Sequence, residues 1–353
     1  MLLTIKPKNM QKFYTLLLVS VFVIQANVSG QYVTKKVRSV HEAYTDSLKN
    51  VQYDYIFPIL GQGAYKQGFD IPYPAGIMAN YIWMDQGLDM TNMQLGFDGT
   101  NTDIPLSPTD FIEFGDNRNT SYIYNVRPDL WILPFLNVYG LFGGGKSVTE
   151  VNLIAPIELK SVVEQNVRTA GLGVMTAFGV GPVWVNVDVN WTWTKPELLD
   201  KPVKVGVLGL RIGHTFTFKK RPYSNIAIWA GAMSLKMGEE TVGQIALIDA
   251  LPQETWDRRD EIVNQYNAWY DGLSPAKQAI VDNTAFPEII DRIGAADGSA
   301  VIGYAMDKKT SEMWNGIVGA QYQFNKKWQL RTEWGIIGDR KSMLFSLNYR
   351  FLL

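Results

Sequence analysis

Residues 183–194 alternate apolar and polar side chains over twelve positions, and no other feature constrains the fold as strongly. The stretch, VWVNVDVNWTWT, places Val and two Trp on one face and mainly Asn, Asp and Thr on the other. A period of two is that of a β-strand, whose successive side chains point to opposite faces. Soluble strands usually have about five or six residues, whereas a tilted strand needs roughly 9–11 to cross a bilayer. The stretch is therefore predicted to be a membrane-crossing strand.

The same alternation recurs along the chain. Strands are predicted over 76–84, 88–97, 119–132, 135–143, 167–178, 182–194, 202–218, 223–235, 313–324, 327–336 and 341–351, with shorter candidates at 147–154, 241–248 and 299–306. A soluble β-sandwich also alternates, but its strands are shorter, and here the aromatic residues gather at strand ends. An open sheet edge in lipid would leave backbone groups unpaired, so the sheet must close. Since ordinary bacterial barrels have an even number of strands, we predict an all-β fold: a transmembrane antiparallel β-barrel of about 12 strands, with 10 or 14 as alternatives.

The two faces of these strands predict two sets of residues. Aromatic side chains near the ends of the apolar face would form a girdle at the membrane interfaces: Trp191, Trp193, Phe216, Phe218, Tyr322, Phe324, Trp328, Tyr349 and Phe351. The polar face would line the lumen, because a charge facing lipid costs roughly 2–4 kcal/mol. The predicted lumen-lining residues are Asp188, Arg211, Gln321, Gln323, Gln329, Arg331, Glu333, Asn348 and Arg350. If 182–194 and 202–218 form a hairpin, Asp188 and Arg211 should make an inward ion pair.

The N-terminus has the form of a secretory signal. Lys6, Lys8 and Lys12 precede a short apolar run at 16–24, and small residues follow at 28–30. These features predict a signal peptide over residues 1–30 that is removed on export. Residues 31–75 are predicted to be a periplasmic or lumen-entering segment, and residues 76–353 the barrel domain.

The last strand carries a resemblance to a known class. From Met343 to Phe351, aromatic and aliphatic residues occupy every second position, which resembles the C-terminal assembly signal of Gram-negative outer-membrane barrels, although Leu352 and Leu353 follow the Phe. Residues 127–140, RPDLWILPFLNVYG, resemble a segment of uncharacterised transporter-like barrels of the Bacteroidota. The resemblance implies a location in the cell outer membrane. It also implies contact with outer-membrane lipids and with the barrel assembly machinery through the C-terminal strand.

One segment departs from the strand pattern. In residues 252–296, apolar residues such as Trp256, Ile262, Tyr266 and Trp269 recur every three or four positions, as in a helix. Ser274-Pro275 predicts the start of a second helix, and 287–293 predicts a third. A barrel wall has no room for helices, so this insert must sit inside the lumen, over a mouth or in the periplasm. It is either a folded loop packed on the barrel rim or a plug or gate.

Composition excludes several kinds of chemistry. The chain has no Cys and two His, with 33 Lys and Arg against 34 Asp and Glu. We therefore predict no catalytic residue, no metal site, no cofactor and no nucleic-acid partner. The function predicted first is a passive channel or transporter for small polar solutes. The alternative is a structural or interaction barrel without an open pore; a lipid hydrolase that uses His214 is a distant third. The pattern leaves the oligomeric state open.

Overall fold

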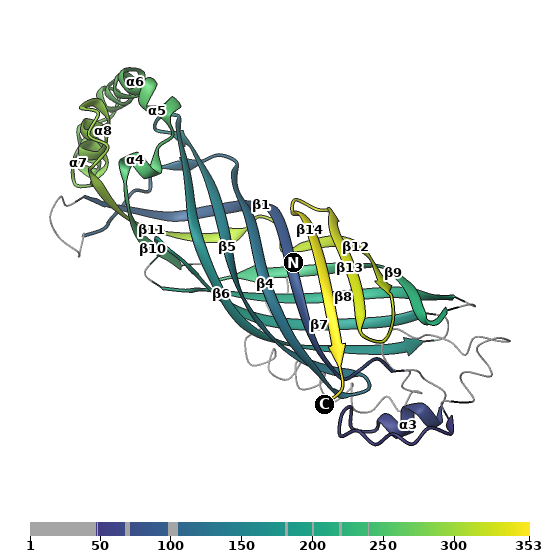
Figure 1. The fold of residues 1–353 in the computed structure, drawn as a ribbon. Coiled ribbons are helices and arrows are strands. Elements are labelled where there is room, and N and C mark those ends of the chain that lie inside the picture. Colours follow the sequence, from purple (N-terminus) through teal and green to yellow (C-terminus); the bar gives the residue numbers. More distant parts are fainter. Residues whose placement is uncertain are drawn as a thin grey trace, which may run out of the picture.

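The computed structural model describes residues 47–353, apart from 48, 68–70, 98–104, 181–182, 200, 219–220 and 239. The predicted signal peptide lies outside the described residues. Ten strands form a closed antiparallel barrel (Figure 1). These strands are β1 (Ala75–Phe97), β4 (Asn117–Leu133), β5 (Leu136–Ala155), β6 (Leu159–Val180), β7 (Val183–Pro196), β8 (Val203–Phe218), β9 (Arg221–Met237), β12 (Trp314–Gln323), β13 (Trp328–Ile337) and β14 (Lys341–Phe351).

Strand β1 closes the ring because it pairs with both the last strand and the second strand of the barrel. Ala75 lies opposite Phe351 of β14 on one side and opposite Leu130 of β4 on the other. Every neighbouring pair in the ring is antiparallel, as the sequence predicted.

The expected number of about 12 strands is not confirmed, and β1 supplies the reason. The segments 76–84 and 88–97, predicted as two strands, are one strand of 23 residues. The polar residues Asp85 and Gln86 separate the two predicted segments, but distant residues satisfy them within the sheet. Arg118 pairs with Asp85, and Arg340 Nε donates a hydrogen bond of 3.0 Å to Gln86 Oε1.

The three shorter candidates add no strand to the ring. Residues 147–154 continue β5. The other two become β10 (Glu240–Ala246) and β11 (Val301–Thr310), which extend the sheet from the distal half of β1. Short strands β2 (Ser107–Pro108) and β3 (Glu113–Phe114) pair with β1 and β5. We call this region beyond the ring the outer extension: residues 88–97, 105–116, 147–165 and 240–310.

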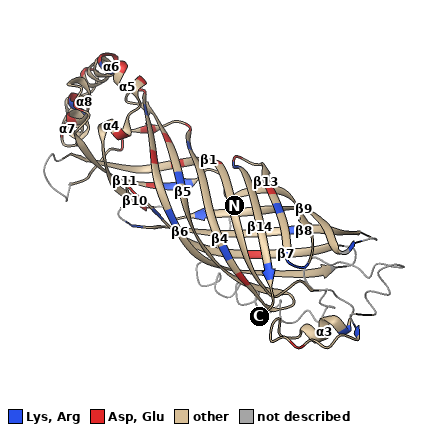
Figure 2. Ribbon diagram, in the orientation of Figure 1, with Lys and Arg blue, Asp and Glu red and all other residues tan. Residues whose placement is uncertain are grey.

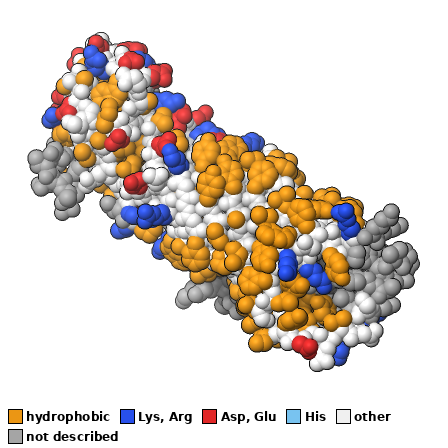
Figure 3. Space-filling model, viewed as in Figure 1, with side chains coloured by type: hydrophobic (Ala, Val, Ile, Leu, Met, Phe, Trp, Pro, Cys, Tyr) orange, Lys and Arg blue, Asp and Glu red, His pale blue; other side chains and the backbone are white. Residues whose placement is uncertain are grey.

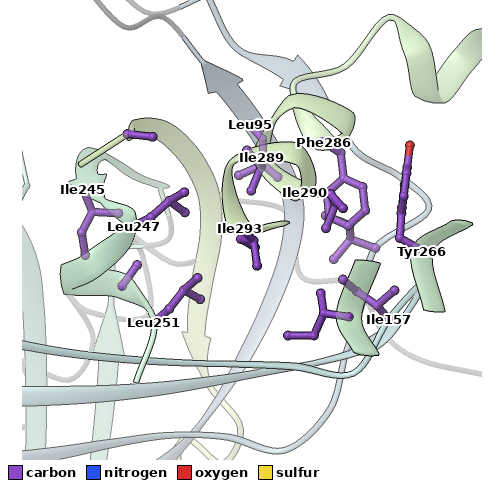
Figure 4. Packing of buried hydrophobic residues seen from close by; sticks show 14 of the residues in the cluster. Leu95, Ile157, Ile245, Leu247, Leu251, Tyr266, Phe286, Ile289, Ile290 and Ile293 are labelled. Carbon is purple, nitrogen blue, oxygen red and sulfur yellow. The ribbon is translucent and has the colours of Figure 1, made fainter. Parts of the chain in front are cut away.

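The predicted helical insert is part of the outer extension, packs on its strands, and forms five helices with the residues before it. They are α4 (Leu247–Ala250), α5 (Gln253–Asp257), α6 (Arg259–Asp271), α7 (Pro275–Asp282) and α8 (Phe286–Gly294). Phe286, Ile289, Ile290 and Ile293 share one face of α8 and are almost fully buried against the strands of the outer extension (Figure 4). The helices lie at the far end of the outer extension, outside the ring of ten strands (Figure 1). Among the described residues, no helix is both long and apolar enough to span a membrane.

The segment before β1 lies at the opposite end of the barrel, near the C-terminus (Figure 1). It contains α3 (Gly61–Lys66). Its backbone bonds to β4, since Ile59 N donates to Ile132 O at 2.8 Å and Trp131 N donates to Pro74 O at 2.9 Å. This segment is thereby attached to the base of the barrel.

Charge and apolar surface divide the molecule along its length. Charged residues are frequent on the helices and sparse over the barrel wall (Figure 2). On the face shown in Figure 3, hydrophobic side chains dominate the barrel body, whereas basic and acidic side chains gather over the helical end. Exposed aliphatic residues such as Ile212, Leu330 and Leu347 lie on the outer surface of the barrel wall. The barrel wall therefore has the exterior that a lipid environment requires.

Candidate functional site: the barrel interior and the outer cavities

The nine predicted lumen-lining residues lie on the inner face of the barrel. Seven are buried and two, Asp188 and Gln323, are half-buried. Neighbouring positions on the same strands, such as Leu210, Ile212, Leu330 and Leu347, are exposed. Inward burial thus alternates with outward exposure, as a closed sheet requires.

Four charged residues form a network inside the barrel. The carboxylate of Glu333 on β13 accepts hydrogen bonds from Arg211 Nε at 2.6 Å and Arg211 Nη2 at 2.9 Å. Arg331 Nη2 donates to the same carboxylate at 2.9 Å, and Arg211 also pairs with Asp188 on β7. The predicted Asp188–Arg211 ion pair is therefore confirmed. Because two acids meet two bases, the network has no net charge.

The contact between Arg211 and Glu333 matters because their strands are not neighbours. Strands β9 and β12 separate β8 from β13 in the ring. The two side chains therefore meet inside the barrel rather than along the wall. A charged pair in this position occupies the lumen at the level of the network.

Aromatic rings fill the space around this network. Trp229 Nε1 donates to Glu333 Oε2 at 2.8 Å, and its ring lies against that of Trp184, with centroids 6.0 Å apart. The rings fit because the strand positions facing them are glycines: a Cβ at Gly319 would lie 2.4 Å from the Trp229 ring, and one at Gly213 would lie 2.3 Å from the Trp184 ring. The middle of the lumen is thus packed with side chains.

A second polar cluster lies nearer the C-terminal end. Arg350 Nη2 donates to Asp129 Oδ1 at 3.1 Å, and Arg350 also donates to the carbonyls of Tyr73 and Pro74. Asn137 Nδ2 donates to the same Asp129 oxygen at 2.8 Å. This cluster ties the segment before β1 to the inner face of the barrel. Farther along, Asn348 donates to Gln329, which donates to Gln323.

The predicted girdle residues lie at the two ends of the barrel wall. Seven lie at the C-terminal end, where Phe218, Tyr322 and Phe324 form one run of ring contacts. Trp328, Tyr349 and Phe351 form another. Trp191 and Trp193 lie toward the opposite end and are 48% and 42% exposed. His214 is half-buried in the wall, with its ring 4.6 Å from that of Phe216.

Two adjoining cavities lie on the other side of the network, toward the outer extension. The inner one, of about 230 Å³, has hydroxyl and amide groups set among apolar side chains, including those of Asn119, Ser121, Thr169 and Thr194. The outer one, of about 120 Å³, lies under the helices and is mainly apolar. We call them the polar chamber and the apolar cavity. Thr149, Gln165 and Lys308 line both.

Lys308 was missed in the sequence analysis, although a signal for it exists. On β11 it shares a face with Ile302, Tyr304 and Met306, which line the apolar cavity. A charged residue on the apolar face of an alternating strand is the kind of exception that marks a site. The candidate strand at 299–306 ended two residues before it.

Comparisons with known proteins give only distant matches. No family model matches the chain, and no curated protein matches it. Among solved structures, the β-domain of the Bordetella autotransporter BrkA covers 79% of this chain and all of its own length, with 9% identity and a TM-score of 0.35. The transport unit of the Escherichia coli autotransporter AIDA-I covers 90% of this chain and 100% of its own, with 7% identity and a TM-score of 0.34. An outer-membrane channel from Pseudomonas putida F1 covers 80% and 97%, with 12% identity and a TM-score of 0.30. The class of this protein, a closed β-barrel with an apolar wall, therefore rests on its own geometry.

Proposed function

We propose that this chain is an outer-membrane β-barrel without an open pore, whose outer extension carries the function. One observation supports it above all: the Arg211–Glu333 pair lies inside the lumen, where Glu333 also accepts a hydrogen bond from Trp229, whose ring lies against that of Trp184. A ten-stranded barrel is only slightly wider than the eight-stranded barrels that side chains fill. Here two guanidinium groups and two indole rings occupy that interior.

The apolar wall and its two aromatic bands support an outer-membrane location. Lipid, unlike water, favours a sheet with no open edge and an apolar exterior. The C-terminal end would then face the periplasm, where the barrel assembly machinery meets the last strand. The outer extension would face the exterior of the cell.

The experiment that tests the closed pore is conductance in planar bilayers. The purified, folded protein should insert without discrete current steps at moderate voltage. As a positive control, the double variant Arg211→Ala and Glu333→Ala, which removes the bridge while keeping the charge balance, should give measurable steps. Steady conductance from the wild-type protein would contradict the closed barrel.

A second function is favoured by the polar chamber. The hydroxyl and amide groups in its lining could bind a small polar solute, and it lies directly beyond the charged network. If the network opened, the protein would be a channel or transporter for such solutes, the function predicted first from the sequence. Liposome swelling with small sugars separates the two: a closed barrel gives no swelling, and a transporter gives swelling that depends on the solute.

A further inference from the structure

Lys308 has an uncommon position for a charged side chain. Its strand neighbours on the same face line an apolar cavity, and the carboxylates of Asp307 and Asp89 lie on the outward face. Among the residues that the structure describes, no hydrogen-bond or salt-bridge partner is recorded for its ammonium group. It is the one charged residue in the described lining of either cavity.

The charged form of an ammonium group is unfavourable in apolar surroundings when no partner pairs with it. Transferring a charge out of water is costly unless a partner replaces the lost hydration. Burial accordingly lowers the pKa of Lys308 from 10.5 to about 8, with no opposing contribution from an acidic neighbour. The side chain retains some surface, and that surface faces the two cavities. The ammonium group of Lys308 is therefore available to pair with a negatively charged ligand that enters either cavity.

The cavity above Lys308 defines the rest of the ligand. Its walls come from β1, β5, β6, β10 and β11 and from α4 and α8, including Leu95, Leu247, Phe286 and Ile293. A dry apolar cavity of about 150 Å³ holds a benzene molecule. A cavity of about 120 Å³ therefore accommodates an apolar group of about five carbons.

We propose that the apolar cavity and Lys308 together bind a small amphipathic carboxylate. The apolar body occupies the cavity under α8, and the carboxylate pairs with the Lys308 ammonium at the boundary with the polar chamber. The amide of Gln165 and the hydroxyl of Thr149, which line both cavities, lie where a carboxylate could accept further hydrogen bonds. The proposal deepens the proposed function, because it names the ligand class of the outer extension.

The test is equilibrium dialysis of hexanoate against the folded full-length protein in detergent, with empty micelles as the blank. Hexanoate carries a five-carbon tail and one carboxylate. Hexan-1-ol, which lacks the charge, and acetate, which lacks the tail, should each bind about tenfold more weakly or worse. Equal binding of hexanol would overturn the role of Lys308, and equal binding of acetate would overturn the role of the cavity.

Variants separate the charge from the cavity. Lys308→Met keeps the length of the side chain and should weaken hexanoate binding about tenfold, whereas Lys308→Arg should retain binding. Lys309→Met is the matched control: Lys309 is exposed on the other face and lies 3.7 Å from Asp89, so its loss should change nothing. Ala250→Leu should weaken binding with the charge intact, because Ala250 lines the cavity and is buried. Heat-dependent gel mobility confirms that each variant is folded.

The outcomes distinguish this proposal from the closed barrel. No hexanoate binding to the wild type, or equal loss in Lys308→Met and Lys309→Met, overturns the carboxylate site and leaves the closed barrel standing. Conductance of the same preparation tests the closed barrel alone, since an open pore would contradict it whether or not hexanoate binds.

Discussion

The charged network inside the lumen makes a quantitative prediction. Glu333→Gln keeps the shape of the side chain and removes its charge, which leaves Arg211 and Arg331 facing Asp188 alone. Two unit charges about 4 Å apart interact by about 4 kcal/mol at an effective dielectric constant near 20. Removing one partner of a buried pair costs about 3–5 kcal/mol in measured cases. We expect Glu333→Gln to lower the free energy of unfolding by about 3 kcal/mol or more.

The measurement is urea unfolding of the purified protein in detergent, followed by tryptophan fluorescence and gel mobility. Glu150→Gln is the matched control, because the salt bridge of Glu150 with Lys160, at 2.9 Å, has side chains 41% and 44% exposed. Exposed pairs contribute about 0–1 kcal/mol, so this variant should unfold almost as the wild type does. A comparison of Glu333→Gln with Glu150→Gln separates the effect of burial from the effect of losing one carboxylate.

A double-mutant cycle with Arg211→Gln completes the test. If the two side chains interact directly, the double variant should be less destabilised than the sum of the single variants by about 2 kcal/mol or more. A loss below about 1 kcal/mol in Glu333→Gln, or additive single effects, would show that water screens the network. The lumen would then be wet at this level, and the closed-pore reasoning would fail.

Three further predictions concern the wall, the insert and Lys308. Phe351→Asp should sharply reduce insertion into outer membranes while synthesis and export continue, and membrane fractionation checks it; normal insertion would mean that the terminal pattern only packs the strand. Deleting residues 254–294 with a short Gly/Ser bridge should leave conductance unchanged and the barrel resistant to heat on gels, because the helices lie outside the lumen; increased conductance would contradict that placement. Lys308→Met should slow hydrogen exchange in the ligand-free outer extension at pH 7. Because the pKa of Lys308 is lowered by burial, the folded wild type gains stability as pH rises from about 8 toward 10.5. The stability advantage of Lys308→Met over the wild type should therefore shrink over that pH range. An advantage that stays constant with pH would show that the buried charge of Lys308 is not its cause.

The sequence alone determined the faces of the strands. Because side chains alternate every two residues in any strand, the positions of Arg211 and Glu333 inside, and of Ile212 and Trp334 outside, follow from the local pattern. The Asp188–Arg211 pair was also predictable, since a short connection brings adjacent strands into pairing. Each of these features depends on residues that are close in sequence.

Tertiary structure decided the features that depend on distant residues. Strand β1 is continuous because Arg118 and Arg340, which come from other parts of the chain, satisfy the polar residues at its centre. Glu333 meets Arg211 inside the barrel, 122 residues away, because the closed sheet brings β8 and β13 near each other although β9 and β12 lie between them. Lys308 faces two cavities because β11 pairs with the distal half of β1 and the helices cover that end. The sequence period shows which face of its strand a side chain occupies. Only the closed sheet determines which side chains of distant strands it contacts.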